Sequence, residues 1–168
     1  MIRAFHNHHP VIASTAFVSE SAVIIGQVRI GEDAGIWPGA VIRADFGLIE
    51  VGAGSHVEDN CVLHSGTDLR IGRCVIIGHG AVVHCRSIGD HVLVGSNATV
   101  LEEAEIGRYC IVAAGSLVKP GLKVPDYSLV SGVPARVKGK ITNKFIERLH
   151  AGAKTYKELA RKYKIAGL

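Results

Sequence analysis

An aliphatic residue recurs at every sixth position through the first three quarters of the chain, apart from a few intervals of other lengths. The nineteen positions, all Val, Ile or Leu, are Ile12, Val18, Ile24, Ile30, Ile36, Ile42, Val51, Val57, Leu63, Ile71, Ile77, Val83, Ile88, Val94, Val100, Ile106, Val112, Val118 and Val124. A period of six fits neither an α-helix nor one continuous alternating strand. It indicates a short extended segment followed by a turn, repeated many times.

Three such segments close a triangle of eighteen residues, so that successive coils stack as parallel strands about 4.8 Å apart. Glycine often follows the aliphatic residue, and Ala, Ser or Cys usually lies two positions before the next one. The repeat therefore predicts an all-β solenoid, a parallel β-helix, over residues 12–124. It resembles the left-handed β-helix of hexapeptide-repeat proteins, and the expected hand rests on that resemblance alone.

The pattern changes after Val124. Turn residues in 125–141 predict that the stack ends there and that a connector follows. Apolar residues at 3- and 4-residue spacing then predict an amphipathic α-helix over 142–168, packed on the side of the solenoid. Its stripe consists of Phe145, Leu149, Gly152, Tyr156, Leu159 and Tyr163. Residues 1–11 form a separate N-terminal segment.

The net charge of +4 is unevenly distributed. From Arg136 onward there are ten Lys or Arg against two Glu, whereas residues 1–135 carry nine against thirteen acids. Basic residues spread around one helix without interleaved aromatics favour a solvated face, so we expect no nucleic-acid partner. No apolar run is long enough for a membrane span or a secretory signal, and we expect a cytoplasmic protein whose four cysteines are thiols.

Two of the nine histidines are related by the register of the repeat. The interval from Leu63 to Ile71 is eight residues, so the coil from Leu63 to Val83 contains twenty. His64 and His84 each follow a core aliphatic residue directly, and they should stack outward on adjacent coils, one strand spacing apart. The histidines expected to be plain surface residues are His6, His8, His9, His56, His91 and His150.

His79 cannot join this pair from the same chain. It lies five residues before His84, an odd offset that reverses its face within a strand, at roughly 16 Å along the chain. The flat sides of a triangular prism suit cyclic packing, so a neighbouring subunit could supply His79 in a homotrimer with three equivalent sites. Three histidines with an open fourth position are typical of catalytic zinc.

Three segments resemble γ-class carbonic anhydrases: RADFG at 43–47, EDNCVLHSG at 58–66 and IGHGAVVHC at 77–85. The similarity covers nearly the whole chain. It implies a homotrimer that binds Zn²⁺ (or Fe²⁺) between subunits, with His64 and His84 as ligands from one chain and His79 as the ligand from its neighbour. It also implies that Arg43 and Asp45 form an interfacial charged pair.

The same resemblance assigns further roles near the metal. Asp59 matches a position that lines the site, and Tyr156 resembles a helix tyrosine that approaches the metal in some members. Glu58 stands where many members have Gln to orient the bound hydroxide. Phe46 and Thr67 occupy the places of the acidic loop and of the glutamate proposed as proton shuttle.

The activity implied by the resemblance is hydration of CO2 to bicarbonate by metal-bound hydroxide, with Glu58, Asp59 or buffer accepting the proton. DFG followed by DNCVLH also resembles the branch found in phenylacetate and carnitine gene clusters, which leaves a metal-dependent acyl-CoA thioesterase open. A hexapeptide-repeat acyltransferase without metal and an inert trimeric scaffold also remain open, because the fold does not choose among these functions.

Overall fold

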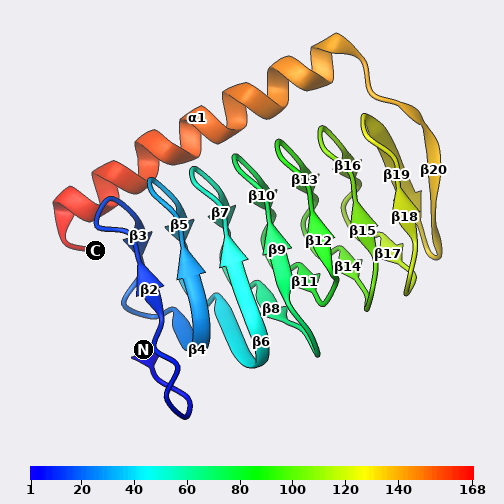
Figure 1. Ribbon diagram of the computed structural model, residues 1–168. Helices are drawn as coiled ribbons and strands as arrows, with labels where there is room; N and C mark the ends of the chain where they lie inside the picture. The colour runs from blue at the N-terminus through cyan, green and yellow to red at the C-terminus, as the bar shows by residue number, and fades with distance from the viewer.

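The computed structural model describes residues 1–168 and shows a parallel β-solenoid with one long C-terminal helix lying along it (Figure 1). The strands form three sides of a prism. Two long strands, β4 (Val23–Ile30) and β6 (Val41–Val51), bend around one corner and join two of these sides into a single sheet. The predicted all-β parallel solenoid with a helix on its side is therefore confirmed.

The first side contains the beginnings of β4 and β6, followed by β8 (Val62–His64), β11 (Val82–Val83), β14 (Thr99–Val100) and β17 (Leu117–Val118). The second side contains β2 (Val11–Ile12), the ends of β4 and β6, β9 (Leu69–Ile71), β12 (Ser87–Ile88), β15 (Glu105–Ile106) and β18 (Lys123–Val124). Near the N-terminus, β1 (Ile2–Arg3) pairs with β4.

The third side is a separate sheet. Its strands are β3 (Phe17–Val18), β5 (Gly35–Ile36), β7 (His56–Val57), β10 (Ile76–Ile77), β13 (Leu93–Val94), β16 (Ile111–Val112) and β19 (Ser128–Gly132). All of these neighbours pair in parallel, and β20 (Ala135–Lys140) then closes the edge in antiparallel orientation.

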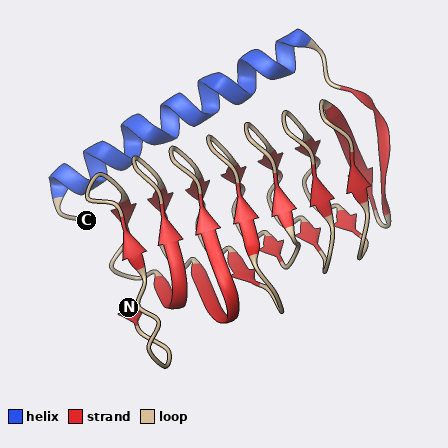
Figure 2. Cartoon of the chain, in the orientation of Figure 1, coloured by secondary structure: helices blue, strands red, loops and turns tan.

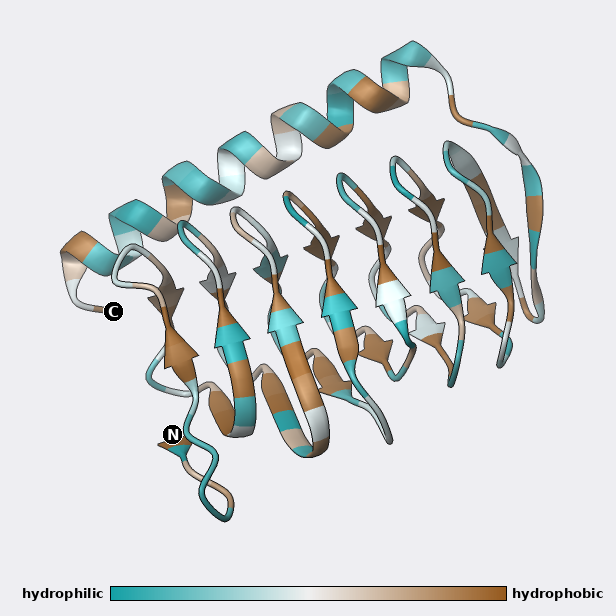
Figure 3. Ribbon diagram, viewed as in Figure 1, coloured by the Kyte–Doolittle hydropathy of each residue, from teal (hydrophilic) through white to brown (hydrophobic).

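The six-residue repeat supplies the core. From Ile24 to Val124 every repeat position is buried, whereas Ile12 and Val18 at the open end are partly buried. Figure 3 shows hydrophobic segments following one another from strand to strand, while much of the helix is hydrophilic. Because each aliphatic side chain lies over the one in the coil before it, the strands share a single register along the whole stack.

The connector predicted over 125–141 differs from the structure. The third side continues through β19, where Val130 is fully buried and pairs with Val112. Val130 lies six residues after Val124, so the repeat extends one position beyond the predicted end. The turn residues before it form one more corner, and the stack ends at the hairpin between β19 and β20.

Helix α1 (Asn143–Ala166) runs back along the prism from β20 toward β3 (Figure 2). It contacts β3, β5 and β7, and buries Leu149, Ala153 and Ala160. Phe17 and Trp37 of the solenoid meet Tyr163, with ring centroids 5.2–5.6 Å apart. No helix in the chain has both the length and the apolar composition that crossing a bilayer requires.

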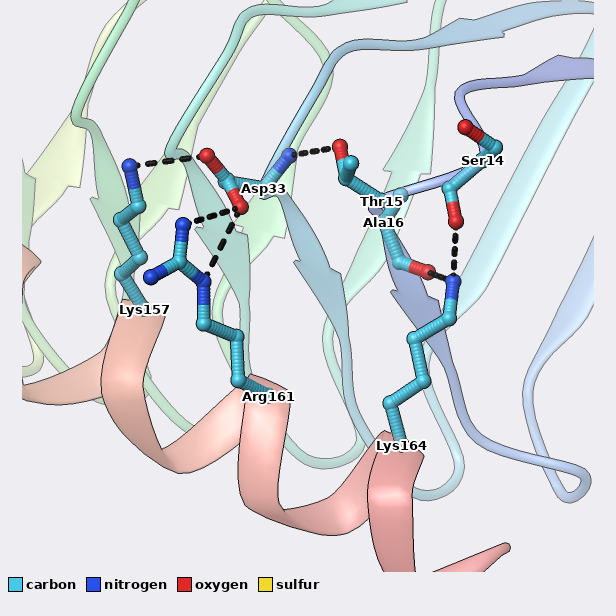
Figure 4. Close-up of polar contacts among 7 residues, drawn as sticks. All are labelled: Ser14, Thr15, Ala16, Asp33, Lys157, Arg161 and Lys164. Carbon is cyan, nitrogen blue, oxygen red and sulfur yellow. Dashed lines mark hydrogen bonds and ion pairs between the residues drawn. The ribbon is translucent and has the colours of Figure 1, made fainter.

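Polar contacts hold the C-terminal half of α1 to the first coils (Figure 4). Asp33 pairs with Lys157 at 2.8 Å and with Arg161 at 3.0 Å, and the bond from Lys157, supported by Arg161, lowers the pKa of this carboxyl. Lys164 donates from Nζ to the carbonyl oxygens of Ser14 and Ala16. Three cations of the basic tail, Lys157, Arg161 and Lys164, are therefore paired with the solenoid.

Candidate metal centre

His64 and His84 lie together at the corner between the first and second sides. Strands β8 and β11 pair with Leu63 opposite Val83, which puts the two following histidines on adjacent coils. Their ring centroids are 5.1 Å apart, and their side chains are 17% and 26% exposed. The expected stacking of these two imidazoles is confirmed, because the repeat fixes the register of the strands that carry them.

Acidic groups surround this pair. Asp45 lies 2.9 Å from Nε2 of His64 through Oδ1, and its other oxygen accepts a hydrogen bond from Arg43. Burial alone would raise the pKa of Asp45, but the bond with His64 and the charge of Arg43 hold it below its ordinary value. Glu102 approaches Nε2 of His84 at 3.7 Å. The corner is thus a cluster of imidazole nitrogens and carboxylates open to solvent on one side.

His79 lies at the opposite end of strand β11, at the corner between the third and first sides. Its Nδ1 is 2.9 Å from Asp59 and its Nε2 is 3.1 Å from Glu58, whose Oε2 also accepts from the backbone N–H of His79. The side chain of His79 is 54% exposed, against 5% for Glu58. The structure therefore brings His79 together with Glu58 and Asp59, and not with the other two histidines.

Tyr156 joins this second group from the helix. Burial, together with the neighbouring Glu58 carboxylate, raises the pKa of the Tyr156 phenol, which remains a hydrogen-bond donor through the neutral range. Its ring packs against Trp37 at 5.7 Å and His56 at 5.6 Å. The docking of α1 thus places one phenol beside the carboxylates that hold His79.

The first side lies between the two histidine corners and presents apolar side chains to solvent. Val62 and Val82 face each other across β8 and β11, and each is 37% exposed. Leu117 on β17 is partly exposed on the same side. An apolar side flanked by complementary histidine corners is the surface that a cyclic assembly would bury.

The residues at the two corners fit a Zn²⁺ or Fe²⁺ ion by their chemistry. Imidazole nitrogen is a preferred donor for both metals, and nearby carboxylates commonly orient such ligands. No group of three or more His, Cys, Asp or Glu within one chain is arranged to hold a metal. Binding through Nε2 of His64 or His79 would replace a carboxylate contact that the single chain makes.

His56, expected on the surface, is instead fully buried beneath α1. Its exposure was wrongly predicted because the helix that covers it lies far along the sequence. The sequence does contain a signal for this burial. On the third side, the residue directly before the core aliphatic is apolar or glycine in all the remaining coils. These residues are Phe17, Gly35, Ile76, Leu93, Ile111 and Leu129. His91 also differs from the expectation, because it is only partly exposed and its ring lies 4.8 Å from that of His150 on α1. His150 itself is exposed, as expected.

Known proteins share the repeat and resemble this chain over most of its length. Residues 87–120 match the family model "bacterial transferase hexapeptide (six repeats)". The chain is 39% identical to carnitine operon protein CaiE of Escherichia coli K12, over 93% of this chain and 81% of CaiE. It is 38% identical to mitochondrial gamma carbonic anhydrase 2 of Arabidopsis thaliana over 90% of this chain, and it spans 58% of that protein's length.

A solved structure has the same fold over nearly the whole chain. The crystal structure of a hexapeptide transferase family protein from Anaplasma phagocytophilum superposes with a TM-score of 0.93 at 38% identity, covering 96% of this chain and 97% of that one. The solenoid and its C-terminal helix are therefore shared with a protein of closely similar length. The chain belongs to the γ-carbonic anhydrase-like family of hexapeptide-repeat proteins.

Proposed function

We propose that this protein is a metal-dependent enzyme that hydrates CO2 to bicarbonate at a site shared between subunits of a homotrimer. The observation that carries the proposal is the division of three histidines between two corners of one side. His64 and His84 lie 5.1 Å apart at one corner, and His79 projects from the other end of β11. One chain thus carries a pair of histidines at one corner and a single histidine at the other, so the pair from one chain and the single histidine from a second chain can form one site.

Packing of the apolar first side would bring the two corners of neighbouring subunits together. His79 of the partner subunit would then join His64 and His84, and rotation by a third of a turn would generate three equal sites. Arg43, which is 46% exposed and paired with Asp45, lies at the His64 corner, where its guanidinium can reach across the interface. The attraction between the two charges grows when the interface excludes water, although desolvating them costs free energy.

A zinc or ferrous ion at this site would lower the pKa of a bound water toward neutrality and so supply hydroxide for attack on carbon. The protein's own residues then have separate tasks. Buried Glu58 orients His79 through the backbone N–H, and Tyr156 stabilises the Glu58 carboxylate from the helix side. Asp59, whose side chain is 40% exposed, can pass a proton from its carboxylate to solvent or buffer.

We place this activity in a reducing compartment such as the cytoplasm. All four cysteines are free, and Cys61, Cys85 and Cys110 are buried. Burial raises the pKa of the Cys61 and Cys85 thiols to about 12, so they remain neutral packing groups. Unpaired structural thiols of this kind are usual where disulfides do not persist.

Metal-dependent hydrolysis of an acyl-CoA thioester is the second candidate, and a groove beside His64 favours it. Phe46, 70% exposed, lies with its ring centroid 5.8 Å from that of His64. It borders a groove of about 590 Å³ that Arg70 and Arg86 also line. CO2 needs no such groove, whereas a long anionic substrate would use the aromatic ring and Arg70, since Arg86 is already paired with Glu103.

The test combines metal analysis with two assays on protein loaded anaerobically with Zn²⁺ or Fe²⁺. We expect one metal per subunit and CO2 hydration by stopped flow in the wild type. Both should be lost in His84→Ala and retained in the control His9→Ala, which changes an exposed N-terminal histidine. Stoichiometric metal in His84→Ala would contradict the ligand assignment.

The relative rates distinguish the candidate functions. Acyl-CoA hydrolysis without CO2 hydration would favour the thioesterase, and a metallated trimer inactive in both assays would favour a scaffold. Acyl transfer by metal-free protein would instead support an acyltransferase.

A further inference from the structure

The corner between the second and third sides carries a regular column of residues in the left-handed backbone conformation. Their φ angles lie between 53° and 65°. Each backbone N–H donates to the coil before it: Asp33 to the hydroxyl oxygen of Thr15, and the others to a carbonyl oxygen, as from His91 to Arg73 at 2.9 Å. In order along the stack the column consists of Asp33, Gly54, Cys74, His91, Tyr109 and Tyr127.

Aromatic rings stack flat along the second half of this column. His91 lies on Tyr109 with centroids 4.7 Å apart and planes 12° apart, and Tyr109 lies on Tyr127 at 5.1 Å and 1°. The stack stops at His91, because the next two positions are Cys74 and Gly54. A Cβ added at Gly54 would meet only the sulfur of Cys74, at 3.4 Å. The outer face of the His91 ring therefore borders an unfilled part of the column.

Helix α1 spans this gap and converts it into a groove of about 770 Å³. The column forms its floor, and His150, Ala153, Lys154 and Lys157 line it from the helix. Lys157 is held by Asp33 at one end (Figure 4), and the His150 ring stands nearly perpendicular to His91 at 70° near the other. The volume is in the range of sites that hold small organic ligands.

The charges lining the groove are only partly paired. Arg73 and Lys154 both border it, and neither forms an ion pair within the chain. Glu32 lies at the Asp33 end, so the free cations favour an anion toward the middle of the groove. Nδ1 of His91 is buried and has no hydrogen-bond partner in the chain. An anionic ligand could pair with both Arg73 and Lys154.

We propose that this groove binds a small ligand made of a flat aromatic ring that carries an anionic group such as phosphate. The ring occupies the gap at Gly54 and Cys74 and continues the stack on His91. The anionic group lies between Arg73 and Lys154. The site is at the corner opposite the first side, so it is independent of the metal centre and stays open in the proposed trimer.

Calorimetric titration of the full chain tests this with four probes. We expect saturable binding of phenyl phosphate or AMP, with the two probes distinguishing a single ring from a nucleotide. Adenosine, which has the ring without the charge, and inorganic phosphate, which has the charge without the ring, should each bind at least tenfold more weakly. Absence of binding by both aromatic phosphates, or equal binding of inorganic phosphate, would overturn the proposal.

Two variants and a control locate the binding. Cys74→Tyr should abolish it by filling the gap, and the fold tolerates Tyr there because Tyr109 and Tyr127 adopt the same backbone conformation in this column. Lys154→Ala should weaken binding at least fivefold, whereas Lys162→Ala, an exposed helix lysine outside the groove, should not. Unchanged affinity in folded Cys74→Tyr would show that the ligand binds elsewhere.

Discussion

The imidazole of His56 is enclosed between the third side of the solenoid and α1. Its ring packs 6.3 Å from that of Trp37 and 5.6 Å from that of Tyr156, and neither of its nitrogens has a hydrogen-bond partner in the chain. A Cβ at Gly35 would lie 2.5 Å from Nδ1, so only glycine leaves room for this ring. Burial lowers the pKa of His56 to about 4.

This burial makes stability depend on pH in a defined direction. Below about pH 6.5 the unfolded chain binds a proton at His56, while the folded chain binds it only near pH 4. The free energy of unfolding should therefore fall as the pH is lowered from about 6.5 to about 4, by about 3 kcal/mol for this group. His56→Phe keeps the ring volume and should flatten that part of the profile, as measured by urea unfolding from pH 4 to 7. The control His6→Ala should retain the wild-type slope, and an equally steep profile in His56→Phe would contradict the assignment.

The difference between His64 and His56 shows what the sequence can predict for single residues. The stacking of His64 on His84 follows from local register, because both residues directly follow aliphatic residues that pair across adjacent strands. The burial of His56 depends on a helix about a hundred residues later. The site roles of His64, His79 and His84 remain predictions, since they depend on a second chain.

At the level of elements, the repeat and the helix were predictable because each has a strong period. The helix was expected from residue 142 and begins at Asn143, and it ends where Gly167 takes the left-handed conformation, with φ 72°. The predicted end of the solenoid at residue 124 is too early. Turn residues at 125–127 resemble a terminus, yet Val130 keeps the six-residue spacing and continues the core. Spacing was the better guide than turn composition, because every corner of this fold is itself a turn.

The docking of α1 rests on its aromatic contacts more than on its full apolar stripe. Tyr163 lies 5.2 Å from Trp37 and 5.6 Å from Phe17, whereas Leu159 of the same predicted stripe is 36% exposed. Tyr163→Ala should lower the free energy of unfolding by about 2 kcal/mol, and Leu159→Ala by less than about 0.5 kcal/mol. Urea unfolding measures both. Equal losses in the two variants would show that α1 is held by its whole stripe.

For the whole molecule, the repeat predicts the prism formed by one chain, but it does not predict how several chains assemble to complete the metal site. The repeat yields flat sides in any solenoid of this kind. The first side differs because exposed Val62 and Val82 lie on it and because its two corners carry the three histidines. Assembly and metal binding should therefore be linked through this one surface.

Val82→Glu tests that link by placing a carboxylate at the centre of the first side, where packing against a neighbour would bury it unpaired. Sedimentation should show the wild type at about three times the chain mass of 17.8 kDa and the variant at the single-chain mass. Because His79 must then come from the partner subunit, the folded monomer should bind metal far more weakly than the trimer. The matched control is Val137→Glu on β20, which is 44% exposed at a position paired with Val130 of the third side and should remain trimeric and metallated. A wild type that sediments as a monomer would contradict the proposed assembly, and a monomeric Val82→Glu that retains stoichiometric metal would show that one chain completes the site alone.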